Sequence, residues 1–241
     1  MYNIVEFETL NSTNKFALEH IKEYEPNTII RAQIQKNGRG RFARKWISDK
    51  KNNCYISFIL KPDLKHKENF KNLTQYLSIV LCKTLSEYGI CTSIKWPNDV
   101  QISGKKIAGI LSEISFSGKN FNGIILGIGV NLNLEQKDLE NINIPATSLN
   151  IELSQKIDSK IFIDKLVQKF FENYEILLEK GFAPFRAEYI ALCNFLGKEI
   201  TIKNPKIEIQ GKAINIKEDG TLEIIIADGS IKTILSGDVL F

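Results

Sequence analysis

Histidine and paired cysteine are scarce in this 241-residue sequence, and their scarcity excludes several kinds of site. The only two histidines, His20 and His66, are far apart in the chain. A histidine-based zinc site or a Ser-His-Asp triad therefore has little to be built from. The four cysteines form no Cys-x-x-Cys pair, and three of them lie in apolar runs, where a free cysteine usually serves as a small core residue. A disulfide framework is not expected.

Long hydrophobic runs are also missing. The longest, residues 124–130, is far shorter than the roughly 20 residues that span a bilayer. The N-terminus has no charged region followed by an apolar stretch, so we identify no signal peptide. We therefore expect a soluble protein of a reducing compartment, the cytoplasm, with no membrane partner.

Composition and length point to an ordinary globular protein. Hydrophobic residues make up 43% and charged residues 25% of the sequence, which excludes bulk disorder. The net charge of +4 is too weak by itself to indicate nucleic-acid binding. The length favours one main core with a small appendage over two full domains.

Hydrophobic periodicity predicts an α+β fold. Apolar spacing indicates helices at residues 70–88 and 158–181, and a short helix capped near Ser12. The intervening strands come in hairpins as well as helix-separated pieces, which favours a mixed β-sheet with helices packed on one face. After residue 194, Asp219-Gly220 and Asp228-Gly229 separate short strands with strong hairpin signals. We therefore expect a main domain at residues 1–194 and a small β-barrel at residues 195–241.

The first candidate site is a glycine- and arginine-rich stretch, residues 36–45, which we call the basic loop. It contains Gly38-Arg39-Gly40-Arg41 and Arg44, and Trp46 follows it. Glycines let a backbone approach a ligand closely, and guanidinium groups suit phosphate or carboxylate. No Gly-Lys-Ser/Thr sequence closes the loop, so it is not a P-loop. A solvated basic loop or an RNA contact remains the alternative interpretation.

A second candidate is Lys95-Trp96-Pro97-Asn98-Asp99, followed closely by Gly104-Lys105-Lys106-Ile107-Ala108-Gly109. Lys106 precedes apolar residues that should be buried, so we expect it at the edge of a core, where it can neutralise charge developing on an oxygen. A basic hairpin turn is the alternative.

Two shorter motifs are weaker by themselves. Gly127-Ile128-Gly129-Val130-Asn131 lacks the third glycine of a dinucleotide fingerprint, and its glycines indicate either close approach by a ligand or tight sheet packing. Ser12-Thr13-Asn14 offers hydroxyl and amide groups to a polar, uncharged ligand, although helix capping also explains it.

Taken together, the order and spacing of these motifs resemble the biotin–protein ligase family over nearly the whole chain. The stretch at residues 146–149, Ala-Thr-Ser-Leu, and the small C-terminal domain belong to the same pattern. The resemblance implies a core like that of class II aminoacyl-tRNA synthetases and biotin ligases, with an SH3-like C-terminal barrel. It also implies an ATP-dependent, AMP-forming ligase that makes biotinyl-5′-AMP and pyrophosphate, then biotinylates a lysine of a carrier protein.

The resemblance also implies roles for individual residues. Those expected to bind biotin are Ser12, Thr13, Asn14, Gln35, Gly38, Arg39, Gly40, Arg41, Lys106, Gly109 and Gly127. Those expected to bind ATP or the adenylate are Arg41, Arg44, Trp46, Lys95, Asn98, Lys106 and Asn131. The catalytic set is Lys106, Arg39, Arg41 and Asp99, with Asp99 near the incoming lysine. Substrates and cofactors are biotin, ATP and Mg²⁺, and no metal site made by protein ligands is expected.

The implied partner is a biotin carboxyl carrier domain of acetyl-CoA carboxylase or of another biotin-dependent carboxylase. Repressor members of the family carry a DNA-binding domain before the Ser-Thr-Asn motif, which begins here at residue 12. We therefore expect a monofunctional ligase that does not bind DNA. A homodimer is compatible with the resemblance. Where the family loop often has Arg and Gly, this chain has Phe42 and Ala43, which removes one charge and one flexible hinge.

Two other functions would use some of the same residues. A lipoyl or octanoyl transferase shares a similar core, but its substrates lack the ureido ring that Ser12, Thr13 and Gln35 would bind. An RNA-binding module would use the basic residues for phosphate contacts and lose affinity steeply with salt. It gives no reason for the Lys-Trp-Pro-Asn-Asp motif.

Overall fold

The structure is a computed structural model, which describes residues 2–140, 142–205 and 207–240. Its contacts divide the chain into two compact units. The first comprises the chain up to Lys67 together with Gly104–Gln168, and the second comprises Glu68–Ser103 together with the chain from Lys169 onward. Each unit is described by itself.

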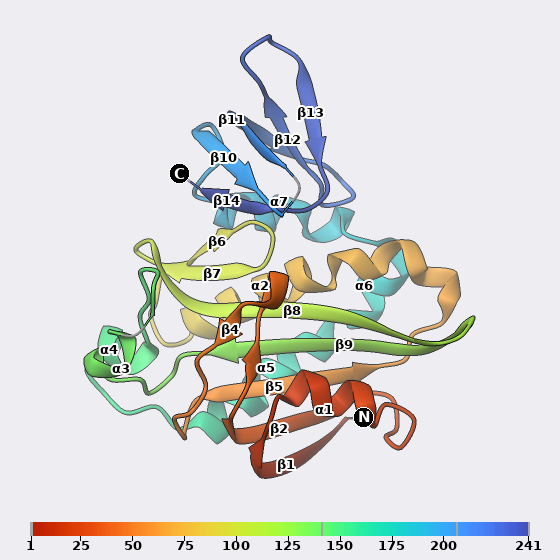
Figure 1. The fold of residues 1–241 in the computed structure, drawn as a ribbon, viewed down its shortest axis with the longest axis vertical. Helices are drawn as coiled ribbons and strands as arrows, with labels where there is room; N and C mark the ends of the chain where they lie inside the picture. The colour runs from red at the N-terminus through yellow and green to blue at the C-terminus, as the bar shows by residue number, and fades with distance from the viewer. Residues whose placement is uncertain (1, 141, 206, 241) are drawn as a thin grey trace. The chain divides into compact units, whose positions relative to one another are not determined.

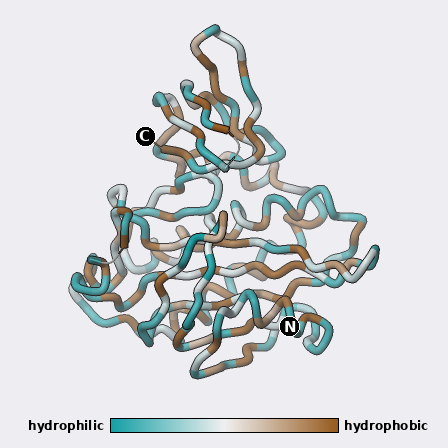
Figure 2. The backbone as a smooth tube through the Cα atoms, viewed as in Figure 1, coloured by the Kyte–Doolittle hydropathy of each residue, from teal (hydrophilic) through white to brown (hydrophobic). Residues whose placement is uncertain are grey.

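The first unit is built on a mixed sheet. Its strands are β1 (Asn3–Leu10), β2 (Thr28–Gln35), β5 (Cys54–Leu60), β8 (Lys105–Ser117) and β9 (Asn120–Val130). They lie in the order β1-β2-β5-β9-β8, with β1 and β2 parallel and the later neighbours antiparallel (Figure 1). Every residue of β5 is buried, and Figure 2 shows hydrophobic stretches along the central strands of this unit. The expected mixed sheet is confirmed.

Helices lie on both faces of this sheet. Helix α1 (Thr13–Glu19) and the turn after it bury Ala17 and Ile21 against isoleucines of β2, β5 and β9. Helix α5 (Ser159–Glu172) begins on the other face, where Ser159 accepts a hydrogen bond from the buried Arg31 at 3.0 Å. Arg31 and its neighbour Ile30 point to opposite faces because side chains alternate along a strand. The α+β class is confirmed, with helices on two faces where the sequence predicted one.

The second unit combines helices, a hairpin and a separate sheet. Its helices are α2 (Leu73–Ser86), α6 (Tyr174–Lys180) and α7 (Ala183–Leu192), and its hairpin joins β6 (Ser93–Lys95) to β7 (Asp99–Ile102). The helix predicted over residues 158–181 is in fact α5 and α6, because Asn173 leaves the helical conformation, with φ −129° and ψ 14°. The prediction was right about helical content and wrong about continuity.

The C-terminal sheet of the second unit is antiparallel throughout. Its strands are β10 (Glu199–Lys203), β11 (Glu208–Ile216), β12 (Leu222–Ile225), β13 (Ile231–Ile234) and β14 (Asp238–Leu240). Their order is β13-β12-β11-β10-β14, so β13 and β14 form the two edges. Within the described part of the chain the sheet is therefore open, where the sequence predicted a closed barrel. None of the helices in residues 2–140, 142–205 and 207–240 has the length and apolarity needed to cross a bilayer.

Candidate active site

The start of α1 carries a buried polar cluster. Ser12 caps the helix, and its hydroxyl accepts the backbone N–H of Lys15 at 3.4 Å. Thr13 and Asn14, the next two residues, are 4% and 5% exposed, although both are polar. Buried polar groups are costly unless they are hydrogen-bonded, so this cluster needs partners from elsewhere in the fold.

The partners come from β2 and β5. The side-chain oxygen of Gln35, the last residue of β2, accepts hydrogen bonds from the Thr13 backbone N–H at 2.8 Å and from the Thr13 hydroxyl at 3.1 Å. Ser57 on β5 donates to Asn14 Oδ1 at 2.6 Å, and its oxygen lies 2.8 Å from the Thr13 hydroxyl. The structure thus brings Thr13, Asn14 and Gln35 together as the sequence predicted. It adds Ser57, which the motif analysis missed because nothing in the local sequence marks it.

Gly127 on β9 makes room for this cluster. A Cβ atom at this position would lie 1.8 Å from Asn14 Oδ1, so no larger residue fits without moving the Asn14 side chain. Close approach of another chain segment is therefore the reason for this glycine.

The basic loop forms a small hairpin rather than an irregular loop. Strand β3 (Gly38–Arg39) pairs with β4 (Lys45–Trp46), and the Gly40 N–H donates to the Arg44 carbonyl at 2.8 Å. The turn between the strands holds Phe42 at φ 53° and Ala43 at φ 58°. Non-glycine residues in this left-handed region are strained by about 1–2 kcal/mol each.

A pocket of about 550 Å³ adjoins this hairpin and is lined by residues 37–45, Leu111 and Glu113. The guanidinium carbons of Arg41 and Arg44 lie 4.8 and 5.7 Å from the centre of the Phe42 ring, within cation–π range. The phenyl group that replaces an arginine of the family pattern therefore contacts the two remaining arginines of the turn.

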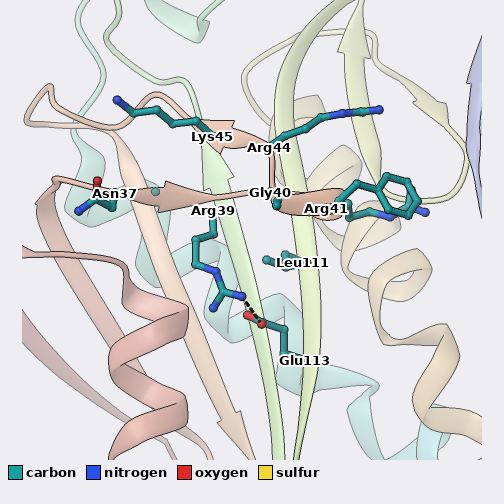
Figure 3. Close-up of a pocket in the computed structure, with 11 residues that line it drawn as sticks. Asn37, Arg39, Gly40, Arg41, Arg44, Lys45, Leu111 and Glu113 are labelled. Carbon is teal, nitrogen blue, oxygen red and sulfur yellow. Dashed lines mark hydrogen bonds and ion pairs between the residues drawn. The ribbon is translucent and has the colours of Figure 1, made fainter. Parts of the chain in front are cut away.

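Glu113 on β8 joins the basic loop to the polar cluster. One of its carboxylate oxygens lies 2.8 Å from Arg39 Nη2, and the other accepts a hydrogen bond from Asn14 Nδ2 at 2.9 Å. Figure 3 shows Arg39 pointing toward Glu113 across the pocket, while Arg44 and Lys45 extend away from it. Glu113 lies four residues after the Gly104–Gly109 motif and had no predicted role. Its contacts span 74 and 99 residues of sequence, and only the fold reveals them.

A second cluster lies around Trp46. Lys106, at the start of β8, places its ammonium group 5.4 Å from the centre of the Trp46 ring. A Cβ at Gly129 would lie 2.5 Å from Trp46 Nε1, and a Cβ at Gly109 would lie 3.2 Å from Trp46 and from the Lys106 side chain. The two glycines thus make the space that the indole and the lysine occupy. The buried Trp46 Nε1 has no hydrogen-bond partner within the described residues.

The segment at residues 146–149 runs beside Lys106 and Asn131. The Lys106 backbone N–H donates to the Pro145 carbonyl at 2.8 Å, and the Thr147 N–H donates to the Lys106 carbonyl at 3.0 Å. Asn131, 3% exposed, donates its side-chain N–H to the Thr147 carbonyl at 3.0 Å. These bonds fix the backbone of Lys106 and the side chain of Asn131.

The remaining predicted site residues, Lys95, Asn98 and Asp99, lie on the β6–β7 hairpin of the second unit. The first unit by itself therefore brings together the predicted residues of the Ser-Thr-Asn motif, the basic loop, the β8 start and β9.

Chemically, the first unit combines an uncharged polar cluster with a set of cations. Arg39, Arg41, Arg44 and Lys45 line the pocket together with one carboxylate, Glu113. Lys106 adds a further cation beside Trp46. Such an arrangement stabilises negative charge on carboxylate and phosphate oxygens. No group of three metal-binding side chains (His, Cys, Asp or Glu) occurs in the parts of the chain that the structure describes.

Comparison with known proteins agrees with this geometry. Residues 6–131 match the Biotin/lipoate A/B protein ligase family, and residues 195–241 match the Biotin protein ligase C terminal domain. The bifunctional ligase/repressor BirA of Bacillus subtilis is 32% identical over 240 residues, which cover 98% of this chain and 73% of that protein. A biotin–[acetyl-CoA-carboxylase] ligase of Paracoccus denitrificans is 30% identical over 96% of this chain and 97% of its own length.

Solved structures give the same result. The biotin protein ligase of Aquifex aeolicus, in complex with biotin and ATP, superimposes with a TM-score of 0.83 and 32% identity, covering 100% of this chain and 98% of that one. The family matches extend over residues 6–131 and over the C-terminal sheet. This chain therefore belongs to the biotin protein ligase family and is a ligase.

Proposed function

We propose that this enzyme activates biotin with ATP, forming biotinyl-5′-AMP and pyrophosphate, and then transfers the biotinyl group to a lysine of a carrier protein, releasing AMP. The observation that carries the proposal is Glu113. It ties an uncharged, buried polar cluster to a cation-lined pocket in one unit. Biotin combines an uncharged ureido ring with a carboxylate. A site that binds it therefore needs both an uncharged polar region and a positively charged region.

We assign the ring of biotin to the polar cluster. Ser12, Thr13 and Gln35 supply hydroxyl, backbone and amide groups that suit the ureido donors and acceptor. Their burial supports the assignment, because hydrogen bonds discriminate most strongly where unpaired groups would be shielded from water. Gly38 and Gly40 let the backbone of the basic loop cover the valeryl chain, together with Gly109 and Gly127 beneath it.

We assign the first chemical step to the cations. An oxygen of the biotin carboxylate attacks the α-phosphorus of ATP, the bond from that phosphorus to the bridging oxygen breaks, and pyrophosphate leaves. Both reactants are anions, so their approach requires positive charge. Lys106 contacts the carboxylate and the α-phosphate oxygens, while Arg39, Arg41 and Arg44 hold the carboxylate and phosphates. ATP enters as its Mg²⁺ complex, in which phosphates and water supply most of the metal ligands.

Trp46 and Asn131 form the adenine side of this proposed site. The Trp46 ring stacks on adenine, and its unpartnered Nε1 gives the site a donor for a ligand atom. Asn131 has its side-chain N–H committed to Thr147, which leaves its amide oxygen to accept from the adenine amino group.

The second step needs a deprotonated lysine amine that attacks the mixed anhydride. We assign Asp99 to orient the incoming ammonium group, and Lys95 and Asn98 to the adenylate phosphate.

The carrier is a biotin carboxyl carrier domain of acetyl-CoA carboxylase or of another biotin-dependent carboxylase. We propose that residues 1–194 form the catalytic domain and residues 195–241 a C-terminal domain. Four free cysteines support a cytoplasmic location, because reducing compartments preserve thiols.

The test is incubation of the protein with biotin, ATP, Mg²⁺ and a carrier domain, followed by mass measurement of the carrier. One biotinyl increment on one lysine supports the proposal, and omission of ATP should abolish it. Biotin-dependent exchange of labelled pyrophosphate into ATP isolates the first step. An exchange that needs lipoate instead of biotin would refute the biotin assignment.

A further inference from the structure

Two Asp-Gly turns in the C-terminal sheet have the same local geometry but different surroundings. Gly220, between β11 and β12, has φ 80°, and Gly229, between β12 and β13, has φ 82°. In each turn the aspartate side chain accepts the N–H of the residue two positions later, at 3.1 and 2.8 Å. The Gly229 turn has open space around it, because a Cβ there would meet no atom within 4 Å.

The Gly220 turn, in contrast, is held by α2 and by the tryptophan of the Lys-Trp-Pro-Asn-Asp motif. The Gly220 carbonyl accepts hydrogen bonds from Gln75 Nε2 at 2.7 Å and from Trp96 Nε1 at 3.2 Å. Asn72 donates to the Asp219 carbonyl at 2.9 Å. A Cβ at Gly220 would lie 2.3 Å from both Asn72 Nδ2 and Gln75 Oε1. We call Asn72, Gln75 and Trp96 the turn clamp.

The members of the clamp are buried, and Asp219 adds a charged contact outside it. Asn72, Gln75 and Trp96 are 2%, 4% and 3% exposed. Partial burial by itself would raise the pKa of Asp219, but hydrogen bonds from Thr221 and Lys71 outweigh it and bring that pKa to about 2. Buried, satisfied hydrogen bonds of this kind specify one arrangement of the elements they join.

Trp96 is thus turned to the C-terminal sheet, although its motif carries residues assigned to the reaction. It directly follows β6, which ends at Lys95, and Pro97, Asn98 and Asp99 come next. Further contacts hold the same hairpin. The backbones of Lys95 and Asp99 are partners in the β6–β7 strand pair, and the Tyr189 hydroxyl lies 3.4 Å from the Pro97 carbonyl. With its N–H committed to Gly220 and its ring buried, Trp96 has no exposed group for a ligand.

We propose that Trp96 is a positioning residue, which uses the Gly220 turn of the C-terminal sheet to fix the hairpin that presents Asn98 and Asp99. The C-terminal sheet then supports the hairpin that carries Asn98 and Asp99, within the second unit. This inference rests on the proposed function, because it takes the roles of Asn98 and Asp99 from there. Misplacing a reacting group by about 1 Å costs up to a hundredfold in rate, so a loosened clamp should be measurable.

The experiment compares Gly220→Ala with Gly229→Ala in the full chain. Both substitutions force alanine into the same left-handed backbone conformation, but only the first also displaces Asn72 and Gln75. Gly220→Ala should lower kcat of carrier biotinylation, which includes the steps assigned to both Asn98 and Asp99, by about tenfold or more. The KM for biotin should stay within about twofold, because the ring-binding residues belong to the other unit. Gly229→Ala should leave kcat within about twofold of the wild type.

Trp96→Phe tests the same contact from the other side, because it keeps an aromatic ring but removes the indole N–H together with part of the ring system. It should lower kcat by itself and on the Gly229→Ala background, but cause little further loss on the Gly220→Ala background. Circular dichroism and thermal melting show which variants fold. If Gly220→Ala does not fold, Trp96→Phe decides the question: a lower kcat with an unchanged KM for biotin supports the inference, and an unchanged kcat overturns it.

Two other outcomes also overturn the inference: equal losses in the two glycine variants, and additive losses in the Trp96→Phe, Gly220→Ala double variant. Failure of the proposed function is recognised separately, because the wild type itself would then show no biotin-dependent exchange.

Discussion

Two glycines of β9, Gly127 and Gly129, offer a direct test of the proposed division of the site. They are two residues apart, so a Cβ at either would point to the same face of the sheet. At Gly127 it would lie 1.8 Å from Asn14 Oδ1, and at Gly129 it would lie 2.5 Å from Trp46 Nε1. Substituting alanine at each position therefore disturbs two different parts of the site by the same chemical change.

The size of the effect follows from the contacts that each change removes. Gly127→Ala forces the Asn14 side chain away from Ser57, at 2.6 Å, and from Glu113, at 2.9 Å. Each hydrogen bond contributes about 0.5–1.5 kcal/mol net, so losing two costs about 1–3 kcal/mol. Because these bonds exist with and without ligand, that cost falls on folding stability. If this cluster binds the ring of biotin, the displaced Asn14 also loses its bonds to the ring, and one or two lost bonds of this size raise the Kd for biotin by about 2- to 150-fold. Gly129→Ala should instead raise the Kd for ATP by displacing the indole.

Isothermal titration calorimetry with biotin and with ATP measures both constants without requiring turnover. Each variant serves as the control for the other, since overpacking alone destabilises the fold by about 1–3 kcal/mol in either case. Thermal melting establishes that both remain folded. Wild-type affinity for biotin in Gly127→Ala, or the same pattern of losses in both variants, would refute the assignment of the ring to the Asn14 cluster.

Three further predictions concern charge and reactivity. Lys106→Ala should lower adenylate formation by about a hundredfold or more, whereas the exposed neighbour Lys105→Ala should change it little; a loss below about tenfold removes Lys106 from the proposed role. Glu113→Gln should speed tryptic cleavage of the ligand-free basic loop about two- to fivefold, because it removes a half-exposed ion pair with Arg39. An unchanged cleavage rate would show that this ion pair does not hold the loop. Iodoacetamide at pH 8 should label exposed Cys91 first, as peptide mapping will show, because burial raises the pKa of the other three thiols; initial labelling elsewhere contradicts this.

Sequence patterns predicted the local parts of this fold correctly because local chemistry determines them. The cap at Ser12, the hairpin signals after residue 194 and the alternation that marks the strands all depend on residues close together in the chain. The break at Asn173 could not be predicted in the same way, because the apolar spacing continues through it from α5 to α6. The closed barrel was wrong because hairpin signals fix neighbouring strands but not whether the outermost two meet.

The candidate site shows the same limit. Motifs identified the residue types, yet Ser57 and Glu113 emerged only from contacts between strands that are distant in sequence. The motif containing Trp96 was recognised as unusual for a connector, but its N–H contact to Gly220, 124 residues away, depends on tertiary packing. Patterns thus identify which residues carry chemistry, while the support that positions them depends on the fold.

The turn of the basic loop shows why a departure from the family pattern is not simply a loss. Replacing arginine by Phe42 removes a charge, but the ring lies within cation–π distance of Arg41 and Arg44, which restrains both guanidinium groups. Replacing glycine by Ala43 adds backbone strain at φ 58°. It also reduces the number of backbone conformations that the loop can adopt when the turn is not formed. Phe42 therefore favours the observed turn. Ala43 opposes the turn through strain but favours it through the lower conformational entropy of the loop. In this chain the turn is therefore held by aromatic contact and by restricted backbone freedom.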